Sequence, residues 1–133
     1  MANKVVLLDT SILIDYFRKT EKSNSTWVKL YDQGYDFSIS VITEYEIYSG
    51  ATPSQLDFWE KILKNTSVLA FDQSVVKVAV KTNNNLKSKR KQIDLADLFI
   101  ASTAIAHNLP IATLNKKHFD RIEGLQIIKH EVK

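Results

Sequence analysis

The segment 93–106 (IDLADLFIASTAIA) constrains the fold more than any other part of the chain. From Leu95 onward it is apolar almost all the way round, and it has no charged residue after Asp97. A helix with this pattern is buried on most of its sides. Its two acids, Asp94 and Asp97, stand at its start, where the helix dipole and unpaired backbone N–H groups favour negative charge. We therefore predict a central buried helix, with Asp94 as its N-cap and Asp97 at its third position.

Short apolar runs alternate with helical patterns along the rest of the chain. The first helix is expected to be capped by Thr10 or Ser11. The predicted strands are 4–8, 37–39, 68–71, 109–113 and a last edge strand at 125–128. Strands that alternate with helices favour an α/β fold with three layers, α/β/α, and a largely parallel central sheet. The length predicts a single domain over residues 1–133.

Composition narrows the class of protein. Hydrophobic residues make up 44% and charged residues 25%, as in an ordinary globular protein. The chain has no cysteine, which excludes disulfides and thiolate metal sites and fits a reducing cytoplasm. The apolar run that ends at Asp9 is too short for a signal peptide, and no run reaches the roughly 18 residues of a membrane span. We expect a cytoplasmic protein without a membrane partner. The net charge of +3 hints at a partner that is anionic.

Three acids stand at equivalent ends of the predicted elements. Asp9 follows the first strand, Glu44 lies one turn into the helix after the second strand, and Asp97 opens the central helix. Glu46, two residues after Glu44, must face a different side of its helix. In a parallel sheet the three acids meet at the carboxyl edge, where ligands bind. Converging carboxylates repel one another unless a cation such as Mg²⁺ or Mn²⁺ neutralises them.

Other site chemistries lack the residues that they need. The three histidines, His107, His118 and His130, are dispersed, so we expect no zinc site and treat each as an ordinary surface or loop residue. The chain has no glycine-rich phosphate loop and no G-x-S-x-G motif. A receiver domain would need an acid pair after the first strand, and a haloacid-dehalogenase-type phosphatase would need a second Asp where Ser11 stands.

A basic run precedes the central helix. It consists of Lys87, Lys89, Arg90 and Lys91, and it is either a solvated connector or a patch that contacts RNA phosphates. A metal held by acids beside such cations suggests hydrolysis of a phosphodiester, because the metal lowers the pKa of a bound water and stabilises transition-state charge.

Four segments, in order, resemble the successive motifs of PIN-domain nucleases, and most closely those of the VapC toxins of bacterial toxin–antitoxin pairs. They are 6–15 (VLLDTSILID), 40–50 (SVITEYEIYSG), 97–104 (DLFIASTA) and 111–119 (IATLNKKHF). Any one motif is weak, but four in order span nearly the whole chain. The resemblance implies a PIN-like fold and an endoribonuclease that depends on Mg²⁺, with Mn²⁺ as a substitute, and that cuts tRNA or ribosomal RNA as many members do.

The resemblance also implies roles for individual residues. Asp9 and Asp97 would bind the metal, and Glu44 would complete the catalytic set. The supporting residues would be Ser11, Thr113 and Asn115. Family members usually form homodimers and are inhibited by a cognate antitoxin whose tail occupies the acidic groove.

The last motif departs from the common family pattern. Asn115 and His118 stand where many PIN domains have a fourth acid. We therefore expect one firmly bound ion, with a second recruited by the substrate. The alternative function is a non-catalytic PIN-like module that binds RNA or protein.

Overall fold

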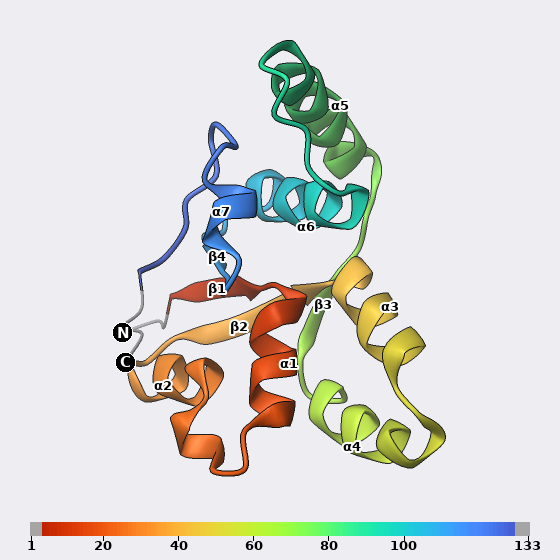
Figure 1. Ribbon diagram of the computed structural model, residues 1–133, viewed down its shortest axis with the longest axis vertical. Helices are drawn as coiled ribbons and strands as arrows, with labels where there is room; N and C mark the ends of the chain where they lie inside the picture. The colour runs from red at the N-terminus through yellow and green to blue at the C-terminus, as the bar shows by residue number, and fades with distance from the viewer. Residues whose placement is uncertain (1–3, 130–133) are drawn as a thin grey trace.

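The centre of the computed structural model, which describes residues 4–129, is a four-stranded sheet (Figure 1). All pairings are parallel, and the strand order is β3-β2-β1-β4. The strands are β1 (Val5–Leu8), β2 (Asp36–Ser40), β3 (Ser67–Leu69) and β4 (Ile111–Ala112). The register sets Leu7 of β1 opposite Ser38 on one side and Ile111 on the other. The predicted α/β fold with a parallel central sheet is confirmed.

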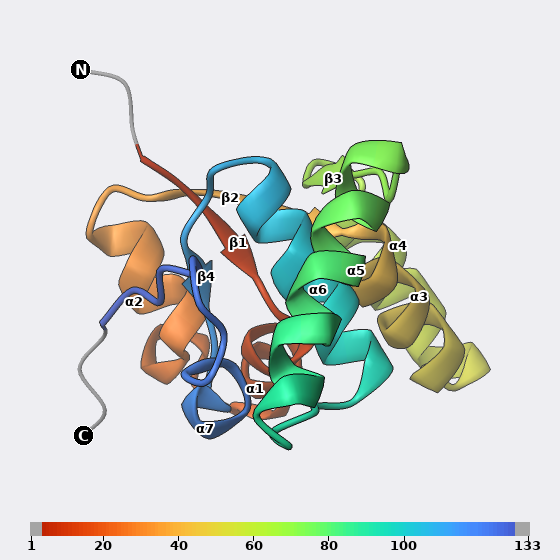
Figure 2. The same cartoon turned by 90° about the horizontal axis from the view of Figure 1, so that it is seen from above.

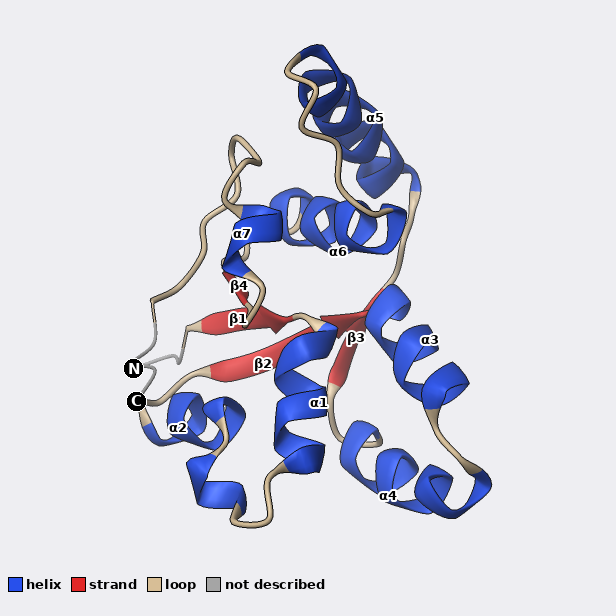
Figure 3. Ribbon diagram, in the orientation of Figure 1, coloured by secondary structure: helices blue, strands red, loops and turns tan. Residues whose placement is uncertain are grey.

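Helices cover both faces of the sheet, as Figures 1 and 3 show. On one face lie α1 (Thr10–Arg18), a short 3₁₀ helix (Lys22–Asn24), α2 (Thr26–Asp32), the inner side of α3 (Val41–Gly50), and α4 (Pro53–Leu63). On the other face lie α5 (Gln73–Ser88), α6 (Leu95–Ala106) and the short α7 (Lys116–Phe119). Helices α5 and α6 pack side by side there (Figure 2). Within residues 4–129, no helix combines the length and the apolar character needed to cross a bilayer.

Strand β1 is buried on both faces, which explains its unbroken apolar sequence. Successive side chains of a strand point to opposite faces. Val6 and Leu8 accordingly join the hydrophobic core under α1 and α2, whereas Leu7 joins the core under α6. All three side chains are fully buried. The chain therefore places Asp9, the next residue, at the end of a strand that is buried on both faces.

Helix α6 is the central buried helix that its sequence predicts. Its buried residues include Leu98, Ile100, Ala101, Ser102, Thr103 and Ala104. The two hydroxyls in this set donate to backbone carbonyls one turn earlier, Ser102 to Leu98 at 2.7 Å and Thr103 to Phe99 at 2.8 Å. Asp94 occupies the N-cap position, although its side chain makes no capping hydrogen bond. Asp97 occupies the third helical position, as predicted.

Three local predictions need correction. Helix α1 is capped by Asp9 itself and not by Thr10 or Ser11, because the Asp9 carboxylate accepts the Ile12 N–H. Strand β4 has two residues rather than five. The predicted edge strand 125–128 is reduced, within the described residues, to an isolated bridge between Ile111 and Ile127. A strand as short as β4 offers its neighbour few backbone groups to pair with.

Candidate active site

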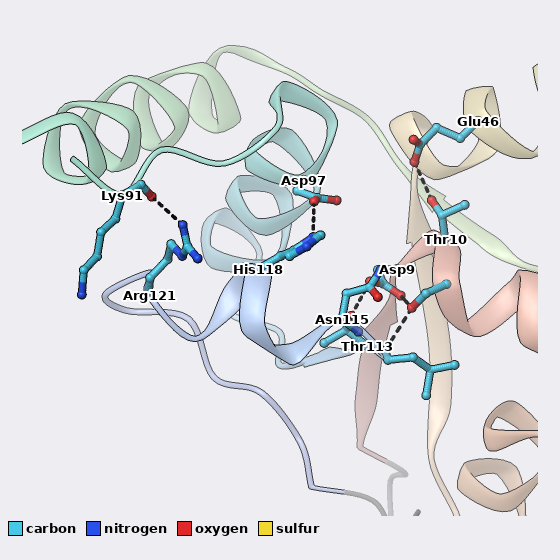
Figure 4. Close-up of polar contacts among 11 residues, drawn as sticks. Asp9, Thr10, Glu46, Lys91, Asp97, Thr113, Asn115, His118 and Arg121 are labelled. Carbon is cyan, nitrogen blue, oxygen red and sulfur yellow. Dashed lines mark hydrogen bonds and ion pairs between the residues drawn. The ribbon is translucent and has the colours of Figure 1, made fainter. Parts of the chain in front are cut away.

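An open cavity of about 620 Å³ lies at the carboxyl ends of β1 and β4. Three of the four carboxylates that line it come from three separate elements: Asp9 at the end of β1, Glu46 from α3 and Asp97 from the first turn of α6 (Figure 4). Arg18 and Lys19, at the end of α1, add two cations. The remaining lining residues are Thr10, Ser11, Ile14, Asp15, Leu114 and Asn115.

Asp9 is the most deeply buried of these acids, with 2% of its surface exposed. Its Oδ1 accepts hydrogen bonds from the Ser11 hydroxyl at 2.5 Å and the Ile12 N–H at 3.3 Å, and its Oδ2 accepts the Thr113 hydroxyl at 2.5 Å. Burial raises the pKa of the Asp9 carboxyl above its ordinary value. The three hydrogen bonds oppose this rise in pKa, and the negative charge of Asp97 adds to it. A cation beside Asp9 would offset both burial and repulsion.

The backbone fixes where Asp9 lies. Its N–H donates to the Ala112 carbonyl at 3.1 Å, which continues the pairing of β1 with β4. Its carboxylate then begins α1 as the N-cap. The segment after β4 comes back to the same carboxylate through Thr113, and the Leu114 N–H donates to the Ser11 hydroxyl at 3.0 Å. Three parts of the fold therefore converge on this one side chain.

Glu46 is the acid of α3 that reaches the cavity. The Thr10 hydroxyl donates to its Oε1 at 2.6 Å, so the contact joins α3 to the first residue of α1 (Figure 4). The Thr43 hydroxyl lies 3.2 Å from the Thr10 hydroxyl, and the Thr43 N–H donates to the Ser40 hydroxyl that caps α3. The contacts of Thr10 thus hold α3 against the start of α1.

Glu44 lies on the other flank of α3 and does not line the cavity. It is near Tyr48, whose pKa is raised by burial and then by the negative charges of Glu44 and Glu60. The structure therefore does not bring Glu44 to the cavity that Asp9 and Asp97 line, and its predicted catalytic role stays a prediction. Glu46, which the helical spacing assigned to a different side, takes that place.

Asp97 is held by a residue that we expected to be an ordinary surface histidine. The Nδ1 of His118, on α7, lies 3.1 Å from Asp97 Oδ2 (Figure 4). The Asp97 side chain is 21% exposed and that of His118 is 53% exposed. The structure thus brings together Asp9 and Asp97, as the strand and helix pattern predicted, with Ser11, Thr113 and Asn115, which the resemblance implied, and it adds His118 to them.

The donor set of the cavity suits a hard divalent cation. The carboxylates of Asp9, Glu46 and Asp97, and that of Asp15 beside them, offer oxygen ligands, which Mg²⁺ and Mn²⁺ prefer. Asp9 is a buried acid with a raised pKa that faces a second acid, an arrangement that a cation stabilises. Within residues 4–129, however, no three Asp, Glu or His side chains meet closely enough to form a complete ligand group. Metal binding stays a prediction.

The basic run lies outside the cavity. Lys87 lies in the last turn of α5, and Lys89, Arg90 and Lys91 follow that helix as exposed residues. The Lys89 ammonium is paired with Glu123, and the Lys91 carbonyl accepts a hydrogen bond from Arg121 at 3.4 Å. These contacts join the basic run to the segment after α7. These intramolecular contacts do not test whether the basic run binds RNA, which stays a prediction.

The sequence does contain a signal for one of the two cations of the cavity. Ser11, Ile14, Asp15 and Arg18 are spaced by three or four residues, so they share one face of a helix. Because Asp9 caps that helix, the face that starts with Ser11 runs along the cavity and brings Arg18 to it. For His118 no comparable signal exists, since its partner is 21 residues away in another element.

Comparisons of the sequence with known proteins and protein families point to one and the same family. Residues 6–125 match the family model of the PIN domain. The chain is 37% identical over 125 residues to the protein named Ribonuclease VapC1 of Methanocaldococcus jannaschii, covering 92% of this chain and 85% of that protein. It is 35% identical over 129 residues to Ribonuclease VapC of Rickettsia bellii, covering 92% of this chain and 94% of that one.

Solved structures give the same architecture. The DNA-bound VapBC structure from Salmonella typhimurium contains a chain that superposes with a TM-score of 0.82 at 24% identity, covering 96% of this chain and 98% of that one. The VapBC-1 structure from nontypeable Haemophilus influenzae contains a chain with a TM-score of 0.80 at 26% identity, covering 93% and 96%. The first of these supports the fold alone, and the second adds a resemblance in sequence.

Proposed function

The chain belongs to the PIN domain family, and from this premise we propose that it is a VapC-type endoribonuclease that hydrolyses phosphodiester bonds of RNA. One observation carries the proposal: Asp9, Glu46 and Asp97, from three separate elements, line a single cavity at the carboxyl edge of a parallel sheet. The names of the two relatives, both called ribonucleases, support the choice of RNA as substrate.

In this proposal Asp9 and Asp97 hold Mg²⁺, or Mn²⁺ in its place. Such an ion, when bound, lowers the pKa of a water and stabilises charge that develops on the phosphoryl oxygens. The buried position of Asp9 and its repulsion by Asp97 support this assignment, since both effects disfavour two bare carboxylates. Asn115 and His118 add no carboxylate to the site, which favours one firmly bound ion over two.

The chain supplies the remaining groups that hydrolysis needs. Hydrolysis forms a bond from a water oxygen to phosphorus and breaks the ester bond to the leaving oxygen, which takes up a proton. Glu46 offers Oε2, the oxygen that does not accept the Thr10 hydroxyl, as an acceptor for the proton of the attacking water. We assign the binding of the phosphates on either side of the cut to Arg18 and Lys19, which line the cavity, although Lys19 also lies 3.5 Å from Asp15 Oδ1.

We further propose that the protein is the toxin of a toxin–antitoxin pair, with tRNA or ribosomal RNA as substrate and a cognate antitoxin as partner. The similar structures, which include VapBC assemblies and a toxin–antitoxin complex from Klebsiella pneumoniae, support a partner of this kind. A homodimer is also proposed. Val76 and Val80 on α5 leave apolar surface in solvent, 44% and 56% exposed, that a second copy would cover. Light scattering on the purified chain measures the mass directly.

The test of the nuclease is cleavage of purified bacterial tRNA and ribosomal RNA by the full chain, with Mg²⁺ or with EDTA. Asp9→Asn and Asp97→Asn are compared with Asp94→Asn, a matched control because Asp94 is an exposed acid of the same helix start that does not line the cavity. We expect discrete fragments that require Mg²⁺, and a rate at least about 100-fold lower in Asp9→Asn and Asp97→Asn, equivalent to about 2.7 kcal/mol of barrier.

Full cleavage by Asp97→Asn, or equal losses in Asp97→Asn and Asp94→Asn, would reject the assignment. If the wild-type chain binds RNA without cutting it in Mg²⁺ and in Mn²⁺, the non-catalytic PIN-like module becomes the better description.

A further inference from the structure

The contact between His118 and Asp97 joins side chains from two different helices. His118 lies in α7, and Asp97 lies in the first turn of α6. The two side chains meet at 3.1 Å through Nδ1 and Oδ2, and Figure 4 shows the ring directed at the carboxylate. A nitrogen lone pair would repel the carboxylate oxygen, so the proton must be on Nδ1, which then donates.

The same segment holds both proposed metal-binding acids. Thr113 donates to Asp9 Oδ2, and the Leu114 N–H supports the Ser11 hydroxyl that donates to Asp9 Oδ1. Five residues after Thr113, His118 contacts Asp97. We call residues 113–118 the clamp segment. It connects to one carboxylate at its start and to the other at its end.

The clamp segment has a fixed backbone. Thr113 is 3% exposed, and Phe119, which follows the segment, is fully buried under α6. The Asn115 N–H donates to the Thr113 hydroxyl at 2.9 Å, and the His118 N–H donates to the Asn115 carbonyl at 2.9 Å. His118 therefore does not hang from a free loop. Its position relative to Thr113 is therefore defined by the hydrogen bonds of the segment.

We infer that His118 is a positioning residue, which donates from Nδ1 to Asp97 Oδ2 and leaves Oδ1 directed into the cavity to bind the divalent cation. The inference rests on the proposed function, because it assigns His118 to the metal site of that reaction. Residues that orient metal-binding side chains by hydrogen bonds typically contribute 10- to 100-fold in metal affinity. His118 then has a function although it supplies none of the negative charge that a fourth acid would.

The test measures Mn²⁺ binding to the full chain by calorimetry in the absence of RNA. His118→Ala removes the donor, His118→Asn keeps one at nearly the same place, and His107→Ala is the matched control, an exposed histidine at the opposite end of α6. We expect His118→Ala to bind Mn²⁺ about 10- to 100-fold more weakly. His118→Asn should stay within about threefold of the wild type, because its amide replaces the Nδ1 donor. His107→Ala should bind as the wild type does.

Cleavage measured against Mn²⁺ concentration gives a second readout. A residue that acts only through Asp97 shifts the Mn²⁺ concentration needed for half-maximal cleavage, and saturating Mn²⁺ restores most of the rate. Wild-type affinity in His118→Ala, or equal weakening in His118→Asn and His118→Ala, overturns the inference.

The two proposals fail in different ways. If the wild-type chain binds Mn²⁺ and needs Asp97 for cleavage while His118→Ala is unaffected, only the inference about His118 fails. If the wild-type chain binds no Mn²⁺, or cuts RNA equally well without Asp97, the proposed function fails and the inference fails with it.

Discussion

The two sides of the acidic cavity are built in different ways. On the strand side, Asp9 is 2% exposed, caps α1 and accepts three hydrogen bonds from groups near β1 and β4. On the helix side, the Asp97 side chain is 21% exposed and its carboxylate meets one side chain, that of His118. The cavity thus faces one acid fixed by the sheet and one fixed by a single contact between helices.

This difference suggests that the two acids contribute different properties to the site. A buried carboxylate with several donors cannot turn, but burial makes its charge costly, as the raised pKa of Asp9 indicates. An acid in the first turn of a helix is stabilised by the helix dipole and keeps more freedom to adjust. The strand side therefore provides a rigid reference, and the helix side can adapt to a cation or a substrate.

The largest expected effect shows which glutamate of α3, Glu46 or Glu44, acts together with Asp9. Glu46→Gln should lower the rate of RNA cleavage by about 100-fold, because it removes a carboxylate that lines the cavity and accepts the Thr10 hydroxyl. Glu44→Gln, two residues away on the same helix, should have little effect. Single-turnover cleavage of one defined RNA at saturating Mg²⁺ measures both. The reverse order of effects would return Glu44 to the site.

The next effect tests how firmly Asp9 is held. Thr113→Val keeps the shape of the side chain but removes the hydroxyl that donates to the buried carboxylate. We expect the free energy of unfolding of the metal-free protein to fall by about 2 kcal/mol, the usual value for a hydrogen bond to a charged group. Urea denaturation in EDTA measures it.

Thr103→Val is the matched control for this measurement. Thr103 is also fully buried, but its hydroxyl donates to a neutral carbonyl of its own helix. If Thr113→Val costs no more than Thr103→Val, the Asp9 carboxylate does not depend on the Thr113 hydroxyl.

A pH titration of stability compares Asp9 with its neutral replacement. Because the folded pKa of Asp9 is raised above its ordinary value of 3.8, the native state binds more protons than the unfolded state between these two pKa values. The metal-free wild type should therefore lose stability relative to Asp9→Asn as the pH rises through that window, and the difference should then level off. Thermal unfolding of both proteins in EDTA at a series of pH values measures the difference. A difference that grows as the pH falls would contradict the raised pKa.

The smallest effect concerns the basic run that precedes α6, on the side of Asp97. Lys87→Ala, Arg90→Ala and Lys91→Ala combined should weaken binding of single-stranded RNA. The slope of log affinity against log salt should fall by about 2, since each phosphate that the protein neutralises adds about 0.7 to it. Lys89→Ala should change the slope less, because Lys89 is already paired with Glu123. Lys61→Ala with Lys64→Ala, exposed on α4 and at its end, serves as the control. An unchanged slope would make the basic run a solvated connector.

The sequence determined the elements that carry the site. The apolar run before Asp9 and the nearly uncharged segment after Asp97 each had one plausible structure, a buried strand and a buried helix, because burial on both sides demands apolar residues throughout. Parallel strands then placed the ends of these elements at one edge. The meeting of Asp9 and Asp97 could therefore be predicted, whereas Thr113 and Asn115 were implied by the family resemblance alone.

Only the tertiary structure decided between Glu44 and Glu46. The buried residues of α3 are Thr43 and Ile47, and at about 100° per residue the two glutamates lie about 80° on either side of that stripe. Helical periodicity is symmetric about the stripe and cannot distinguish its flanks. The contact of Glu46 with Thr10 breaks the symmetry, since α1 lies on that side alone.

His118 likewise depended on the tertiary structure. The sequence around His118 indicates the short segment to which it belongs. Its partner, Asp97, lies on α6, and the packing of Phe119 beneath α6 brings the two elements together. Sequence patterns record which faces of an element are apolar. The meeting of polar side chains from two elements follows from how those elements pack, and that requires all of their contacts at once.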